Sequence, residues 1–119
     1  MINWKLVNKL RPHNRKETMK HFIVKAMVFK LFFNEGDYIY SEYDCLINKK
    51  HKVADVIVKD KNNVNVIKAV IEVETKPTKK HNRELLNFWT DENLYIIDIR
   101  KVPNELNKMQ KFLEHVLGL

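Results

Sequence analysis

The sequence predicts a single α/β domain with the element order αβββαβα, in which helices flank a mixed four-stranded sheet. Three observations support this prediction. Apolar residues recur at helical spacing in three segments, β-branched and aromatic residues form four runs between them, and no repeat or low-complexity linker divides the 119 residues. A chain of this length accommodates one core, so residues 1–119 are expected to form one domain, with residues 1–13 as an N-terminal arm.

The first predicted helix follows Asn14, which resembles a capping box together with Glu17, and it ends at Gly36. One set of its apolar residues recurs at helical spacing, and further apolar residues lie between them. We therefore expect the helix to be covered on most sides, by the sheet or by a partner chain. The spaced set is Met19, Phe22, Ile23, Ala26, Phe29 and Phe33, and the others are Val24, Val28, Leu31 and Phe32.

Four strands are predicted at residues 38–43, 52–58, 65–75 and 94–99, where β-branched and aromatic side chains gather. A turn at 61–63 joins the second strand to the third, whose nearly continuous apolar run indicates a central position in the sheet. Pro77 ends that strand and Thr78 caps the second helix. The second helix carries Leu85, Leu86 and Trp89, and the last helix carries Leu106, Met109, Leu113, Val116 and Leu117 on one face.

Charge and composition restrict the partners. The chain has 22 Lys and Arg residues against 15 Asp and Glu, a net charge of +7, which favours a polyanionic partner or, alternatively, reflects a lysine-rich surface kept for solubility. Only two glycines occur, so phosphate-binding glycine loops and a nucleotide cofactor are not expected. The single Cys45 allows no intrachain disulfide, and neither a membrane span nor a signal peptide is recognised, so we expect a cytoplasmic protein.

Three acidic residues interrupt apolar strands, where a carboxylate is costly unless a cation or a hydrogen-bond donor compensates it. Asp55 lies in the second strand, and Glu72 and Glu74 lie in the third, on one face by the two-residue period of a strand. If the two strands form a hairpin, Asp55 lies across from the pair, and the oxygen ligands suit Mg²⁺ or Mn²⁺. In the competing interpretation, these acids form surface salt bridges with the lysines.

The order of elements and these acids resemble the PD-(D/E)XK nuclease superfamily, with its restriction-endonuclease-like fold, over residues 17–100. The resemblance implies that Asp55 and Glu72 are metal ligands, with the carbonyl of Val73 as a third. It also places Glu42, on the first strand, where many members carry an additional acid.

The departure from the family pattern is at Glu74, which occupies the place of the usual lysine, as in members that carry Glu-x-Glu. A second alignment uses Glu74-Thr75-Lys76 as the literal Glu-x-Lys. We favour Asp55, Glu72 and Glu74, because Glu72 is deeper in the apolar strand and Lys76 adjoins Pro77. Lys76 is then expected to reach the phosphate.

The function implied is Mg²⁺- or Mn²⁺-dependent hydrolysis of DNA by a homodimer, since duplex-cleaving enzymes commonly use two sites. Two alternatives remain: a nuclease-fold protein that binds DNA without hydrolysis, and a protein-interaction subunit whose charge is incidental. Cations at the start of the second helix and on the second strand are expected to bind the DNA backbone. These residues are Lys79, Lys80, His81, Arg83 and Lys52.

Overall fold

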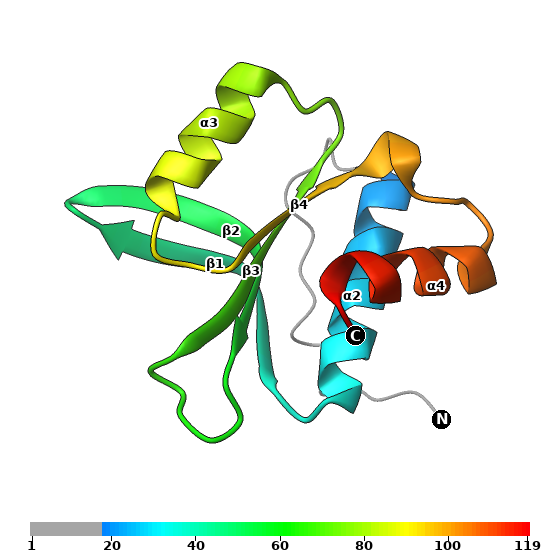
Figure 1. The fold of residues 1–119 in the computed structure, drawn as a ribbon, viewed down its shortest axis with the longest axis horizontal. Coiled ribbons are helices and arrows are strands. Elements are labelled where there is room, and N and C mark those ends of the chain that lie inside the picture. The colour runs from blue at the N-terminus through cyan, green and yellow to red at the C-terminus, as the bar shows by residue number, and fades with distance from the viewer. Residues whose placement is uncertain (1–17) are drawn as a thin grey trace.

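A mixed four-stranded sheet forms the centre of the computed structural model, which describes residues 18–119 (Figure 1). The strand order is β1-β2-β3-β4, with antiparallel β1–β2 and β2–β3 pairs and a parallel β3–β4 pair. The predicted mixed sheet and the central position of the third strand are therefore confirmed. The strands are β1 (Tyr38–Ile47), β2 (Lys50–Lys59), β3 (Ile67–Glu74) and β4 (Leu94–Asp98).

Helices cover both faces of the sheet. α2 (Met19–Asn34) and α4 (Leu106–Leu117) lie next to each other on one face, and α3 (Lys79–Phe88) lies on the other (Figure 1). Because β3 and β4 are parallel, the chain must cross between them, and α3 makes this crossover. A short 3-10 helix, η1 (Ile99–Lys101), follows β4 and leads toward α4.

The start and the buried face of α2 differ from the prediction. Thr18 caps the helix by accepting a hydrogen bond from the His21 amide, in place of Asn14, which lies outside the described residues together with the expected N-terminal arm. Met19 is 73% exposed and Phe33 is 45% exposed, whereas Phe29 of the same spaced set is buried. The buried residues are His21, Val24, Lys25, Val28, Phe29, Leu31 and Phe32.

Two cores follow from the three layers. The larger core lies between the sheet and the two helices α2 and α4. The smaller core lies on the other face, where Leu85 and Trp89 pack between α3 and the sheet. Thr78 caps α3 as predicted. Leu86 and Leu106 were expected on packed helix faces, but both are exposed because each lies on the solvent side of its helix.

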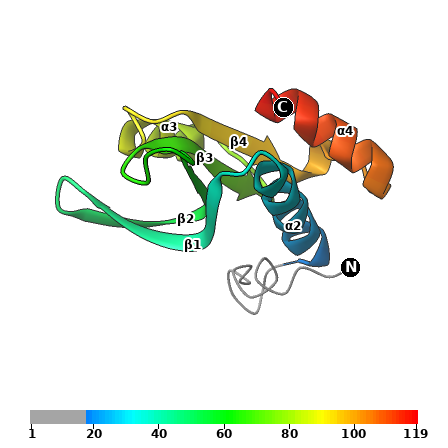
Figure 2. The same cartoon turned by 90° about the horizontal axis from the view of Figure 1, so that it is seen from below.

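The β1–β2 hairpin is longer than the two predicted strands and projects from the rest of the sheet (Figure 2). Its two-residue turn is Asn48-Lys49, with φ of 51° and 66°, as in the type I′ turns that match the twist of a hairpin. Neither residue is a glycine, so the turn lacks the Asn-Gly pair by which such turns are recognised in a sequence. In the described part of the chain, no helix is both long and apolar enough to cross a bilayer.

Candidate functional site

The β1–β2 hairpin is irregular at one pair of opposed residues. Ser41 pairs with Val56 and Tyr43 pairs with Ala54, which places Glu42 opposite Asp55. Glu42 has a φ of 49°, and the side-chain alternation of β1 changes there: Ile39 packs in the core below α2, but the later odd-numbered residues pack below α3. A non-glycine residue in this conformation carries strain, which often marks functional sites.

Pairing between β2 and β3 ends at the same level, at the pair Val56–Ile71, and does not extend to Asp55. At this point the Asp55 side chain takes the place of a backbone carbonyl as the acceptor. Its Oδ2 accepts a hydrogen bond of 2.7 Å from the Val73 amide. The N–H and C=O of one strand residue point toward the same neighbouring strand, so the Val73 carbonyl faces this gap as well. The gap between β2 and β3 therefore brings together Asp55 and the carbonyl expected to bind a metal.

Glu72 lies beside this gap and is 4% exposed. Burial raises the pKa of its carboxyl group to about 8, with a further contribution from the negative charge of Asp55, while Lys52 and the Asp55 backbone lower it. Among the described residues, Oε1 of Glu72 has no hydrogen-bond partner. A buried carboxylate oxygen without a donor is a costly feature, which a bound cation would offset.

Two polar residues of α2 also face this region. Nζ of Lys25 lies 2.9 Å from Oε1 of Glu42, and Nε2 of His21 lies 3.9 Å from Oδ2 of Asp55. Lys25 is completely buried, and His21 is 9% exposed. Neither residue is among the site residues predicted from the sequence, although both continue the Val24, Val28 and Leu31 stripe at helical spacing. A polar residue within an otherwise apolar stripe was the available signal.

Glu74 has a different environment from Glu72. Its Oε1 lies 2.9 Å from Nε2 of His81, on the first turn of α3, and its side chain is 19% exposed. Ile71 and Val73 pack on the opposite face of β3, as the strand period predicted. Glu72 is the acid whose pKa the charge of Asp55 raises, whereas Glu74 contacts the start of α3.

The expected DNA-binding cations are at the surface. Lys76, Lys79, Lys80 and Arg83 are exposed around the beginning of α3, and Lys52 is half-buried near Glu72. Within residues 18–119, no group of three or more His, Cys, Asp and Glu side chains is arranged to hold a metal ion. The acids available at the gap are thus the pair Asp55 and Glu72, with Glu42 bound to Lys25.

Comparison of the chain with protein-family models, curated proteins and solved structures gives no match.

Proposed function

We propose that the protein is a Mg²⁺- or Mn²⁺-dependent DNA endonuclease of the PD-(D/E)XK type. The observation that supports this most is the buried Glu72, whose Oε1 has no hydrogen-bond partner among the described residues, beside Asp55 at the gap between β2 and β3. Two carboxylates on adjacent strands are unfavourable to each other unless a cation or a proton intervenes. A metal site explains why the fold retains both.

The residues at the gap fit a magnesium ion rather than a metal enclosed by protein ligands. Mg²⁺ is usually held by one or two carboxylates and keeps several water molecules. Asp55 and Glu72 would supply the carboxylates, and the Val73 carbonyl, which faces the gap, would supply a third oxygen. Such an ion lowers the pKa of bound water and stabilises the charge that develops on a phosphate.

The remaining residues have roles consistent with their positions. Lys25 neutralises Glu42 in the buried layer next to the acids, so that Glu42 adds little to the repulsion between Asp55 and Glu72. Glu74 and His81, in contact at the first turn of α3, would orient the attacking water. Lys76, Lys79 and Lys80, all exposed at the same end of α3, would hold the DNA backbone.

The test compares Glu72→Gln with Glu74→Gln in a cleavage assay on plasmid, single-stranded and four-way-junction DNA, with Mg²⁺, Mn²⁺ or EDTA. We expect Glu72→Gln and Asp55→Asn to lose at least about a hundredfold in rate, because each removes a metal ligand. Glu74→Lys, which restores the usual lysine of the family, should keep partial activity.

Two results would contradict this assignment. If Glu74 is the ligand, Glu74→Lys is inactive and Lys76→Ala is nearly so. If Asp55→Asn, Glu72→Gln and Glu74→Gln all keep full activity, the acids are not catalytic and the nuclease proposal is wrong.

A second function is favoured by the contact between Glu74 and His81. This contact engages the position where the family usually carries its lysine, so a protein that binds DNA without cleaving it is the alternative. In the same assay, it would bind DNA equally with metal or EDTA and would give no product. Cleavage in Mg²⁺ that EDTA abolishes, and that Glu72→Gln removes, excludes it.

A further inference from the structure

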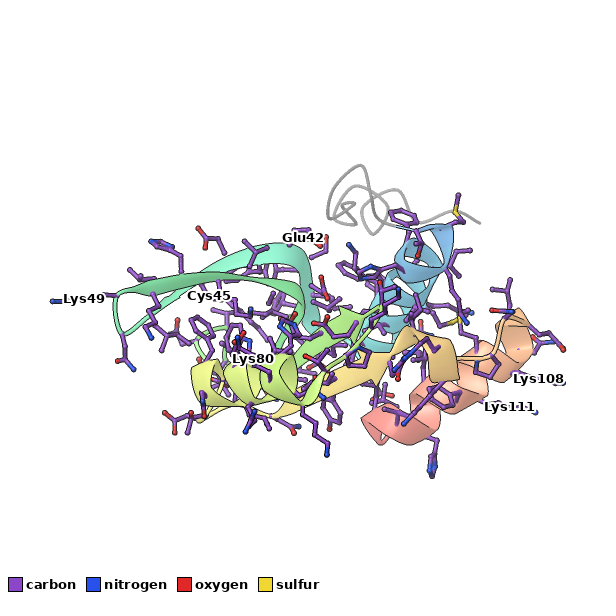
Figure 3. All side chains as sticks on the ribbon, turned by 90° about the horizontal axis from the view of Figure 1, so that it is seen from above. Glu42, Cys45, Lys49, Lys80, Lys108 and Lys111 are labelled. Carbon is purple, nitrogen blue, oxygen red and sulfur yellow. The ribbon has the colours of Figure 1, made fainter. Side chains whose placement is uncertain are left out.

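A groove lies between the tip of the β1–β2 hairpin and α3. Residues of the hairpin between Ile47 and Lys52 form one wall, and Glu84, Asn87 and Phe88 of α3 form the other. Its volume is about 420 Å³. Figure 3 shows Lys49 at the free end of the hairpin.

The hairpin wall of this groove is basic. Lys50 and Lys52 line it from the hairpin, together with His51, whereas the α3 wall carries no lysine or arginine. Glu84 is the acidic residue of the lining, and its carboxylate lies 3.9 Å from Nδ1 of His81. A groove with two lysines along one wall is complementary to the phosphates of a phosphodiester chain.

The inner end of the groove leads toward the acid pair. Lys52 lines the groove and lies three residues before Asp55 on β2. A chain that follows the groove from the hairpin tip therefore approaches Asp55 and Glu72.

The groove also contains an aromatic surface. Phe88 is half-buried, and its ring meets the ring of Trp89 edge to face, with a centroid distance of 4.7 Å. Trp89 is 1% exposed, so it supports the Phe88 ring rigidly from the core. Nucleic-acid bases stack on aromatic side chains of this kind in single-strand binding sites.

We propose that this groove binds one strand of DNA, with phosphates on Lys50 and Lys52 and a base against Phe88, and guides it to the acid pair. This inference makes the proposed nuclease function more specific, and its cleavage step rests on that function. The binding of DNA in the groove does not depend on it. A groove of this volume receives a base and its sugar, whereas a duplex is too wide to enter. The preferred substrate is thus a single-stranded region or a frayed end.

Binding is tested by fluorescence polarisation of labelled oligo(dT) in EDTA over a range of salt concentrations. The variant Lys50→Gln with Lys52→Gln is compared with Lys108→Gln and Lys111→Gln on α4, which lies at the other end of the molecule from the hairpin tip (Figure 3). Both variants lose two charges. We expect the groove variant to bind about tenfold more weakly and to lower the slope of log affinity against log salt by about 1.4, since each single-strand phosphate contact contributes about 0.7.

A second variant tests the aromatic contact. Phe88→Leu should weaken oligo(dT) binding about fivefold and leave binding of an abasic oligomer of the same length unchanged, because only the base is stacked. Glu84→Gln, which removes the acidic residue of the lining without touching the core, should tighten both. Thermal melts of each variant establish that the fold is retained.

The outcomes separate this proposal from the nuclease proposal. Equal binding losses in the groove variant and the α4 variant would overturn the groove, as would tighter binding of duplex than of oligo(dT). If the wild-type protein cleaves DNA while the groove variant binds and cleaves normally, the groove fails and the nuclease function stands. If oligo(dT) binds through Lys50, Lys52 and Phe88 but no substrate is cleaved, the groove stands alone.

Discussion

Individual polar residues in the apolar interior determine how the candidate site can work. Asp55 is stabilised by the Val73 amide and by the proximity of His21, whereas Glu72 depends on weaker compensation from Lys52. Burial and the charge of Asp55 together favour the protonated form of Glu72 at neutral pH. A divalent ion would displace this proton, so metal binding should strengthen as pH rises.

The raised pKa of Glu72 has a consequence for stability. Because this pKa changes from 4.5 to about 8 on folding, the folded chain retains a proton that the unfolded chain releases between these values. Stability should therefore fall as pH rises through this window, and Glu72→Gln, which cannot ionise, should lack this contribution. The measurement is urea unfolding without metal at a series of pH values. Between pH values of about 5 and 9, we expect the unfolding free energy of the wild type to fall by on the order of 4 kcal/mol relative to that of Glu72→Gln.

Glu74→Gln is the control for this measurement. Its side chain is more exposed and contacts His81, so the variant should retain most of the wild-type dependence on pH. Parallel pH profiles for the wild type and Glu72→Gln would show that Glu72 is ionised equally in both states.

The acids of the candidate site were predictable from the sequence, but the α2 residues that contact them were not. Asp55 and Glu72 were conspicuous because they interrupt apolar strands, where an acid needs compensation. Lys25 and His21 were not, because a polar residue on a helix is ordinarily on the solvent side. Only the sheet, which places acids opposite these positions, gives the two residues a reason to be buried.

At the level of elements, the irregular level of Glu42 and Asp55 divides the hairpin into two parts. On the Tyr38–Ser41 side, Ile39 packs in the larger core below α2. Beyond Glu42, the odd-numbered residues pack in the smaller core below α3. The alternation within each part was readable from the sequence. The change between them was not, since Glu42 carries no glycine-like signal for its left-handed conformation.

The hairpin turn offers a test of how function and stability are balanced. Lys49 has a φ of 66°, a conformation that costs a non-glycine residue about 1 kcal/mol. Lys49→Gly should therefore raise the unfolding free energy by about this amount, while weakening oligo(dT) binding severalfold because a cation at the hairpin tip, next to Lys50 of the groove, is lost. Urea unfolding measures the change in stability, and fluorescence polarisation measures the change in oligo(dT) binding. Lys49→Gln removes the charge and keeps a non-glycine backbone, so it separates the two causes. Destabilisation by Lys49→Gly would contradict the strain assigned to this turn.

For the molecule as a whole, topology was more predictable than the orientation of its helices. Short runs of β-branched residues and a helix between two apolar strands determine the order of elements and the parallel β3–β4 pair. The rotation of α2 depended on tertiary partners, because nearly every side of this helix is apolar. Met19 and Phe33, which belong to the apolar set at helical spacing, consequently lie at the surface, although the helix was expected to be covered on most sides.

This outer face of α2 bears on the expected homodimer. Met19 and Phe33 are 14 positions apart, close to four helical turns, so they lie on one side of α2. Since α4 already packs its apolar face into the core, a second copy would dock on this side of α2. Light scattering at about 100 μM should give a dimer mass, and Met19→Glu with Phe33→Glu should give a monomer through the repulsion and desolvation of the new charges. Leu86→Glu with Leu106→Glu, at similarly exposed positions on α3 and α4, should remain dimeric. A wild-type monomer at this concentration, with and without DNA, would show that each chain acts alone and that the apolar face of α2 has another role.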